Sequence, residues 1–330
     1  MKKNNFLQNE EIIKFIKLDF EKRLSKYLNI IKVSSPLAVI DGTGINDDLN
    51  GIEKPISFNI KSLNNQKTTV IQSLAKWKRI RLKYYDIKPG AGILTDMHAI
   101  RPDEKLSSIH SIYVDQWDWE KHIFSEQRNL LYLKNTVNRI YKCIKLTEKR
   151  LFEKYSEFIP ELPDNITFIH SEELFKLYPN LTPIQREDEI SHLNKAVFII
   201  GIGNKLSNGQ PHDNRAPDYD DWSSSNEDDY FGLNGDIIFW NPIINSSFEI
   251  SSMGIRVNKE SMIRQLEISN CQKRKNLLFH RLIINNELPL SIGGGIGQSR
   301  LCMFLMKKSH IGEVQSSIWP KEIIEQYKIL

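Results

Sequence analysis

The chain has 330 residues, of which 40% are hydrophobic and 26% are charged. This composition is ordinary for a globular protein and argues against a disordered one. The 45 basic and 41 acidic side chains leave a net charge of +4, a balance too even for the electrostatic footprint of a protein that binds nucleic acid or a membrane surface. We therefore expect neither nucleic acid nor a membrane among its partners.

The cysteines and the N-terminus indicate where such a protein works. Cys143, Cys271 and Cys302 stand far apart without a CxxC spacing, so they predict neither a zinc site nor a disulfide framework. Polar residues interrupt the first segment before a signal-peptide core can form, and no stretch is long enough to cross a bilayer. We expect a protein of the reducing cytoplasm.

The N-terminal segment predicts a helix followed by a strand. Apolar residues recur at helical spacing from Ile12 to Leu24. The short apolar run over 30–33 predicts a strand, which stops before Pro36. The expected order is helix, strand, proline.

A hairpin and a second helix are expected next. The runs 56–60 and 68–72 predict two strands joined around Asn64 and Asn65, because asparagine side chains tolerate turn geometry. The segment 73–84 is then interpreted as a helix.

The middle of the chain predicts a long hairpin and an amphipathic helix. Two β-rich runs between Gly92 and Glu120 flank the polar segment 101–108, which is typical of two paired strands in an antiparallel sheet. Apolar residues at helical spacing over 130–144 predict a helix. Its lysines and arginines are interpreted as a solvated face.

The last part of the chain is rich in strands. We predict strands over 196–200, 237–240 and 248–257, a polar and acidic loop over 209–235, and a final helix over 299–307. Several strands in a row with helices around them indicate an α+β fold with an antiparallel sheet, and not a parallel doubly wound one.

Two glycine runs invite a nucleotide-binding interpretation. Gly201 and Gly203 resemble the start of a dinucleotide fingerprint, but the third glycine is missing. The run over 293–297 lacks the lysine and hydroxyl of a P-loop, and it could be only a close-packed junction between a strand and a helix. Arg300 favours a nucleotide, because it stands in the first turn after glycines that let a ligand approach the backbone.

One predicted strand carries polar residues suited to a ligand. Period-2 alternation over 112–119 places Gln116 and Asp118 on one face and Trp117 and Trp119 on the other. A buried carboxylate such as Asp118 is costly unless an amine, an arginine or a metal pairs with it. A solvated sheet face is the alternative.

Three segments resemble, in their proper order, the signature motifs of class II aminoacyl-tRNA synthetases. They are the helix and strand that end at Pro36, the arginine Arg101 in a strand-loop-strand hairpin, and the segment 295–301. Within that superfamily the chain is more similar to the bacterial-type, ammonia-dependent asparagine synthetases, the aspartate–ammonia ligases. The stretches that carry this similarity are 73–79, 113–120, 215–222, 233–236 and 251–256.

The resemblance implies both a fold and a reaction. The implied fold is the class II synthetase core, an antiparallel sheet flanked by helices, in a single catalytic domain over 1–330 without an anticodon-binding domain. The implied reaction converts ATP, L-aspartate and ammonia into L-asparagine, AMP and diphosphate through a β-aspartyl-adenylate. The family also implies a homodimer, whose interface would include the helix 12–24 and the region near Pro36.

The implied chemistry brings two anions together, so cations must neutralise them. The resemblance assigns Arg101 to the α-phosphate and Arg300 to the γ-phosphate, and guanidinium groups suit phosphate oxygens because they bind them bidentately. Gly295 and Gly297 are the expected nucleotide-binding glycines. Either arginine could instead be an ordinary surface residue.

Magnesium is implied as the partner of ATP. This ion prefers a few carboxylates together with phosphate oxygens. Asp236 and Glu249 are the candidates, and the class II pattern supports Glu249 more firmly. The same pattern has an acid two residues after the arginine of its second motif. That acid is Asp103 here, but the neighbouring Glu104 is longer, and which of them meets the adenine is left open.

The resemblance also assigns residues to aspartate and to ammonia. The aspartate set comprises Ser73, Lys78, Gln116, Asp118, Arg215 and either Ser251 or Ser252. Asp47 and Asp220 are the carboxylates expected to handle ammonia, because an arriving ammonium ion must be held and then deprotonated. With Arg101 and Gln116 they form the expected catalytic group. The alternative for the acidic segment around Asp220 is a solvated, turn-forming loop.

Two alternative functions share this fold: a tRNA synthetase and a non-catalytic synthetase-like module. Against the first, the first motif begins near the N-terminus and the sequence ends soon after Arg300, which leaves no room for an anticodon-reading domain such as an OB barrel. Against the second, arginines and carboxylates stand at every expected catalytic position.

Overall fold

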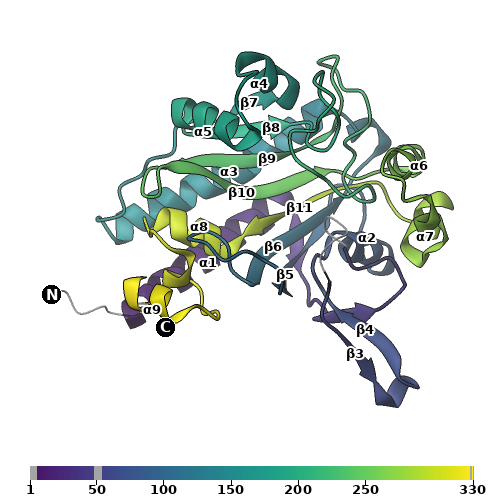
Figure 1. Cartoon of the computed structure of the whole chain (residues 1–330), viewed down its shortest axis with the longest axis horizontal. Coiled ribbons are helices and arrows are strands. Elements are labelled where there is room, and N and C mark those ends of the chain that lie inside the picture. The colour runs from purple at the N-terminus through teal and green to yellow at the C-terminus, as the bar shows by residue number, and fades with distance from the viewer. Residues whose placement is uncertain (1–5, 48–53, 328, 330) are drawn as a thin grey trace.

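The centre of the molecule is a twisted sheet. The computed structural model describes residues 6–47, 54–327 and 329, and in this part of the chain eight strands pair in the order β1-β5-β6-β11-β10-β9-β8-β7 (Figure 1). The strands are β1 (Ile30–Lys32), β5 (Gly92–Ile100), β6 (Tyr113–His122), β7 (Thr167–His170), β8 (Ala196–Ile200), β9 (Asn234–Asn241), β10 (Ser246–Ile255) and β11 (Ser291–Gly297). The strands from β5 to β8 in this order are antiparallel, whereas β1 and β7 add parallel edges. The predicted α+β antiparallel sheet is confirmed.

Two long helices, α1 (Phe6–Leu28) and α3 (Leu130–Lys154), belong to the main hydrophobic core on one face of the sheet. The apolar stripe of α1 includes Phe20, whose ring centroid lies 4.7 Å from that of Trp117 on β6. Trp119 is buried in the same core. Fully burying a large apolar side chain contributes about 1.5–3 kcal/mol to stability. Both helices therefore need apolar residues at helical spacing along the face that meets the core, and this spacing is what the sequence shows.

The opposite face of the sheet is covered by shorter elements. Alternate residues of β8 belong to two different cores, since Phe198 packs toward α1 and α3 while Val197 and Ile199 pack beside α4 and α5. The shorter helices are α2 (Ala75–Tyr84), α4 (Ser171–Leu177), α5 (Pro183–Asn194), α6 (Lys259–Ile268) and α7 (Leu278–Ile284). Two others, α8 (Gln298–Leu305) and α9 (Lys321–Tyr327), pack instead with the main core that contains α1 and α3. None of the helices in the described part of the chain has the length and apolar character needed to cross a membrane.

The predicted hairpin is confirmed as part of a small second sheet that projects from the body (Figure 1). Its strands are β2 (Ala38–Ile40), β3 (Ser57–Ile60) and β4 (Gln66–Val70). Asn64 and Asn65, between β3 and β4, have φ angles of 53° and 59°. Asparagine is one of the few residues that adopt this left-handed conformation readily, so the turn forms where the sequence places it.

The glycine run before α8 forms a central strand, β11, which pairs with both β6 and β10. A Cβ on Gly293 would lie 1.9 Å from Oε2 of Glu120, and one on Gly295 would lie 2.2 Å from Oε1 of Gln116. Glycine is required because polar side chains of β6 occupy the space where side chains of β11 would stand. The strand then leads directly into α8. The glycine run is therefore a close-packed junction between a strand and a helix, which is one of the two interpretations that the sequence allowed.

Candidate active site

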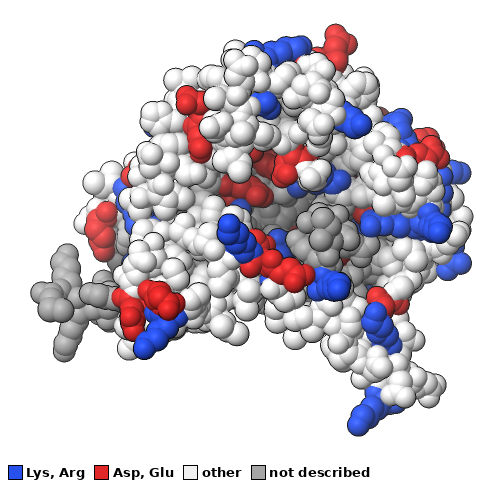
Figure 2. Space-filling model, viewed as in Figure 1, with Lys and Arg blue, Asp and Glu red and all other residues white. Residues whose placement is uncertain are grey.

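A cavity of about 780 Å³ opens on the sheet face opposite α1 and α3. Figure 2 shows the hollow with acidic and basic side chains around it. The structure brings nearly all the predicted site residues together there. Those lining the cavity are Asp47, Ser73, Lys78, Arg101, Gln116, Asp118, Arg215, Asp220, Glu249, Ser252, Gly295, Gly297 and Arg300.

The floor of the cavity is the polar face of β6. Gln116 and Asp118 both line it, as the alternation predicted. Nζ of Lys78, on α2, donates to Oδ1 of Asp118 at 2.6 Å and to the carbonyl oxygen of Gly294 at 3.0 Å. Burial lowers the pKa of the Lys78 ammonium, against the opposing effect of Asp118. Oδ2 of Asp118 has no hydrogen-bond partner in the described part of the chain, so the floor presents a carboxylate oxygen that a cationic ligand group could pair with.

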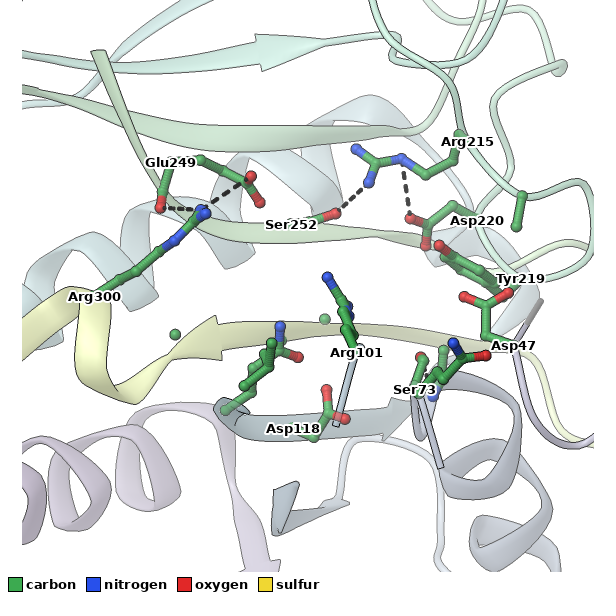
Figure 3. A pocket seen from close by; sticks show the side chains of 18 of the residues that line it. Asp47, Ser73, Arg101, Asp118, Arg215, Tyr219, Asp220, Glu249, Ser252 and Arg300 are labelled. Carbon is green, nitrogen blue, oxygen red and sulfur yellow. Dashed lines mark hydrogen bonds and ion pairs between the residues drawn. The ribbon is translucent and has the colours of Figure 1, made fainter. Parts of the chain in front are cut away.

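Arg101 stands between the two ends of the cavity (Figure 3). It directly follows β5, and its backbone N–H donates to the carbonyl oxygen of Ile112 at 2.8 Å, which closes the loop between β5 and β6. Its buried Nε has no hydrogen-bond partner among the described residues. Leaving such a donor unpaired is costly, so this position favours an anionic ligand.

The loop after Arg101 separates its two acidic residues. Glu104 lines the cavity. Oδ2 of Asp103 instead accepts a hydrogen bond from the backbone N–H of Lys54 at 3.1 Å. Of the two alternatives left by the sequence, the structure favours Glu104 as the acid that can reach a bound ligand.

Arg300 and Glu249 form one end of the cavity (Figure 3). Nη1 of Arg300, in the first turn of α8, lies 3.0 Å from the carbonyl oxygen and 3.3 Å from Oε2 of Glu249. Glu249 stands at the irregularity where the register of β10 and β9 shifts. A carboxylate and a guanidinium at the same end of the cavity can bind a metal ion and a phosphate side by side.

Arg215 binds two of the other predicted residues. Its Nη2 donates to both carboxylate oxygens of Asp236, at 2.7 and 2.8 Å, and its Nη1 donates to Oγ of Ser252 at 2.7 Å. Asp236 does not line the cavity. Ser251 is also outside it, because its hydroxyl donates to the carbonyl oxygen of Gly295 at 2.8 Å. Of the two serines left open by the sequence, Ser252 is the one that faces the cavity.

The predicted magnesium ligands therefore differ in their surroundings. Glu249 lines the cavity, where its carboxylate could bind a metal ion that also binds a phosphate. The carboxylate of Asp236 is instead paired with Arg215. In the described part of the chain no three His, Cys, Asp or Glu side chains are grouped as a metal site. Magnesium commonly uses one or two carboxylates together with substrate phosphates, so Glu249 and a bound nucleotide would supply the donors that it prefers.

The acidic segment is buried at three of its carboxylates, so the solvated-loop alternative is wrong for them. Asp218, Asp220 and Asp221 are each at most 1% exposed. Oδ2 of Asp218 lies 3.1 Å from Nζ of Lys76 and 3.0 Å from Nε2 of His280. Burial alone would raise the pKa of Asp218, but Lys76 and His280, together with a nearby arginine, outweigh it and hold the pKa well below its ordinary value.

Asp220 and Asp221 are bound by two different arginines. Asp220 accepts a hydrogen bond from Nη1 of Arg256, and Asp221 accepts one from Nη2 of Arg128. Because their partners belong to separate elements, the buried carboxylates attach this segment firmly beside the cavity.

Sequence reasoning missed Tyr219 and Arg256, which also line the cavity. Tyr219 lies beside Asp47 and Asp220 at the end of the cavity away from Arg300 (Figure 3). Desolvation raises the pKa of the Tyr219 phenol, and the carboxylates of Asp47 and Asp220 add to the increase. Both missed residues stand inside the stretches that carry the family resemblance, so the signal that could have found them was that they share the stretches 215–222 and 251–256 with Asp220 and Ser252.

Comparisons of the sequence with known proteins indicate one family. The family model described as aspartate-ammonia ligase matches residues 7–329. An aspartate–ammonia ligase from Parabacteroides distasonis is 53% identical over 319 residues, which is 97% of this chain and 92% of the relative. One from Bacteroides fragilis is 55% identical over 316 residues, covering 96% and 92%. One from Clostridium tetani is 50% identical over 313 residues, covering 95% and 89%.

Solved structures show the same fold in class II aminoacyl-tRNA synthetases. The asparaginyl-tRNA synthetase of Pyrococcus horikoshii, complexed with asparaginyl-adenylate, matches with a TM-score of 0.68 at 12% identity, over 95% of this chain and 70% of that one. An aspartyl-tRNA synthetase of Entamoeba histolytica matches with a TM-score of 0.61 at 12% identity, over 93% and 57%. The predicted class II core is confirmed.

Proposed function

The chain belongs to the aspartate–ammonia ligase family, and we propose that it makes L-asparagine from L-aspartate, ammonia and ATP, with AMP and diphosphate as the other products. The observation that carries this proposal is the position of Arg101, whose partly unsatisfied guanidinium stands between a phosphate-suited end and a carboxylate-rich end of one cavity. ATP and aspartate can therefore meet at Arg101.

The first step joins two anions. An oxygen of the aspartate β-carboxylate attacks the α-phosphorus of ATP, and the bond to diphosphate breaks. We assign Arg101 to the α-phosphate, where its fixed charge offsets the negative charge that develops in the transition state. Arg300 would bind the γ-phosphate, and Gly295 and Gly297 would allow the nucleotide close to the backbone. Glu249 would hold magnesium, which neutralises phosphate charge when bound.

Aspartate would lie on the floor of the cavity. The unpartnered Oδ2 of Asp118 suits the α-ammonium group of an amino acid, because it offers the charge and acceptor that this group requires. Ser73, which precedes α2, Lys78 on α2 and Gln116 on β6 would complete the site, together with Arg215 and Ser252 on the opposite wall.

The second step uses ammonia. Its nitrogen attacks the activated β-carbonyl carbon, and AMP leaves with the bridging oxygen. Asp47 and Asp220 lie at the end of the cavity opposite Arg300 (Figure 3), where they can hold an ammonium ion without meeting the triphosphate. Tyr219 joins them there.

Replacing Asp220 with asparagine should harm the second step more than the first. We expect asparagine formation to fall by about tenfold or more, because a carboxylate that holds and deprotonates the nucleophile is lost. Aspartate-dependent exchange of pyrophosphate into ATP, which reports adenylate formation, should change much less. Equal losses in the two assays would remove the assignment of Asp220 to ammonia.

We propose a homodimer in which α1 and the segment around Pro36 contribute to the interface. Leu18 on α1, Ile31 on β1 and Leu37 are exposed large apolar residues in this region, and a second copy of the chain could cover them. Analytical ultracentrifugation at micromolar concentration should show a mass of two chains. A monomer at that concentration would contradict the proposal.

We also propose a cytoplasmic location and a single catalytic domain over residues 1–330. Cys143, Cys271 and Cys302 are all free thiols, which is compatible with a reducing compartment. Strands from the N-terminal and C-terminal parts pair in one sheet, since β6 lies between β5 and β11. Such pairing supports one folding unit.

Product analysis tests the function directly. The purified protein is incubated with ATP, magnesium, aspartate and ammonium, with and without tRNA. We expect AMP and free asparagine in both mixtures. Aminoacylated tRNA without free asparagine would favour a tRNA synthetase, and the absence of AMP in both mixtures would favour a non-catalytic module.

A further inference from the structure

Glu120 lies directly behind the ammonia end of the proposed active site. It follows Gln116 and Asp118 at the same period-2 spacing on β6 and is fully buried, but it does not line the cavity. Its Oε1 accepts a hydrogen bond from the hydroxyl of Ser291 at 2.7 Å, and its Oε2 accepts one from Nη2 of Arg256 at 2.9 Å. A buried carboxylate with this set of donors is held in one orientation.

Arg256 connects this hidden carboxylate with the cavity. Its Nε lies 3.1 Å from both carboxylate oxygens of Glu120, while its Nη1 donates to Asp220. The guanidinium of Arg256 is thus shared between Glu120, which lies outside the cavity, and Asp220, which lines it. The charge of the three groups together is one negative unit.

Two further cations, Arg215 and Arg79, lie near these groups. Nε of Arg215 lies 4.0 Å from Asp220, but Arg215 is bound through two hydrogen bonds by Asp236. The buried guanidinium of Arg79 lies near Glu120 and donates to the backbone carbonyl oxygens of Pro289 and Val257. Without Glu120, the positive charges of Arg79 and Arg256 would therefore face Asp220 without a second carboxylate to offset them. In a desolvated site, one missing charge changes the field strongly.

We propose that Glu120 is a positioning residue that offsets the positive charge of Arg256 and Arg79 behind the ammonia end of the cavity, so that Asp220 retains the negative charge that captures the nucleophile as the ammonium cation and not as neutral ammonia. This inference rests on the proposed function and deepens it by naming a residue outside the cavity that sets the affinity for the ammonium cation. Glu120 acts through Arg256 on Asp220 and does not touch the reactants.

The Glu120→Gln variant tests the charge with little change in shape. We expect the KM for ammonium to rise about tenfold, the scale for one net charge removed near a bound cation, while aspartate-dependent pyrophosphate exchange stays within about twofold. Hydroxylamine, which is uncharged at mildly alkaline pH, attacks the same adenylate and releases AMP. Its KM should not change. A KM that rises equally for both nucleophiles, or a loss of pyrophosphate exchange, would overturn the proposal.

Matched variants separate charge from packing. Glu120→Asp retains the charge, and its KM for ammonium should stay within about twofold of the unmodified protein. Glu148→Gln removes another buried carboxylate, which accepts hydrogen bonds from the backbone of Glu161 and Leu162 far from the cavity. It should leave the KM for ammonium unchanged, and a rise equal to that of Glu120→Gln would contradict a local charge effect.

A second measurement needs no variant, so the inference stays testable if Glu120→Gln does not fold. When the pH is raised by one unit on the acidic side of the ammonium pKa, the KM calculated for the cation should stay constant, whereas the KM calculated for neutral ammonia should change about tenfold. The reverse pattern would show capture of the neutral molecule. An unmodified protein without aspartate-dependent pyrophosphate exchange would instead contradict the proposed function itself, before any comparison of nucleophiles.

Discussion

Replacing Arg101 with alanine should lower kcat/KM for asparagine synthesis by about 10²-fold or more, the scale for losing a preorganised charge contact. Arg101 stands between the two ends of the cavity, and its buried Nε has no hydrogen-bond partner among the described residues, so its guanidinium is placed to bind an anion there. The loss should fall mainly on kcat, because the contact strengthens as negative charge develops in the transition state. Steady-state kinetics with each substrate varied in turn measures it.

Arg300→Ala should cause a loss of similar size, since this arginine is assigned to the γ-phosphate. The matched control is Arg150→Ala. Arg150 is exposed on α3 and pairs only with Glu153 among the described ion pairs, so its removal should leave kcat/KM unchanged. Near-normal turnover in both active-site variants would refute the roles assigned to Arg101 and Arg300.

Apolar periodicity predicted the two longest helices, which bury apolar stripes, and missed several shorter ones, among them α5. The helices α1 and α3 were found because their apolar residues face one core. The buried residues of α5 are Arg186, Ile190 and Ser191, a set that carries little apolar signal. The start of α5 was nevertheless marked in the sequence, because Thr182, Pro183 and Gln185 form a capping box with proline at the first helical position.

The central strand β11 shows a limit of local sequence reasoning. Glycine has low strand propensity, so Gly293, Gly294 and Gly295 indicate a turn when they are considered alone. The strand forms because β6 and β10 offer backbone partners on both sides, and because polar side chains of β6 fill the space above its glycines. Neither neighbour is adjacent in sequence, and only the tertiary structure shows the fit.

The candidate site could be predicted in its residue types but not in its pairings. Alternation correctly placed Gln116 and Asp118 on one face, and the family resemblance identified most of the other predicted side chains that line the cavity. The burial of Asp218 was not foreseen, because its partner Lys76 is 142 residues away in sequence. An acidic run resembles a solvated loop until the cations that neutralise it are placed.

Replacing Lys78 with methionine should lower the free energy of unfolding by about 3–5 kcal/mol, because it leaves the buried carboxylate of Asp118 without its ammonium partner. Lys78 and Asp118 are both nearly inaccessible to solvent, at 1% and 5% side-chain exposure, so water compensates poorly for the lost contact. Urea denaturation at fixed protein concentration measures the change. If the pair acts as a unit, adding Asp118→Asn to Lys78→Met should restore part of the stability.

The same helix supplies a matched control for this prediction. Nζ of Lys83, also on α2, lies 2.8 Å from Oε2 of Glu287, but the two side chains are 37% and 42% exposed. An ion pair in contact with water contributes only about 0–1 kcal/mol, so Lys83→Met should shift the urea midpoint little. Equal destabilisation by the two substitutions would mean that helix packing, and not the buried charge pair, determines the loss. A larger loss for Lys78→Met would show that α2 is stabilised by the same ion pair that forms the floor of the proposed aspartate site.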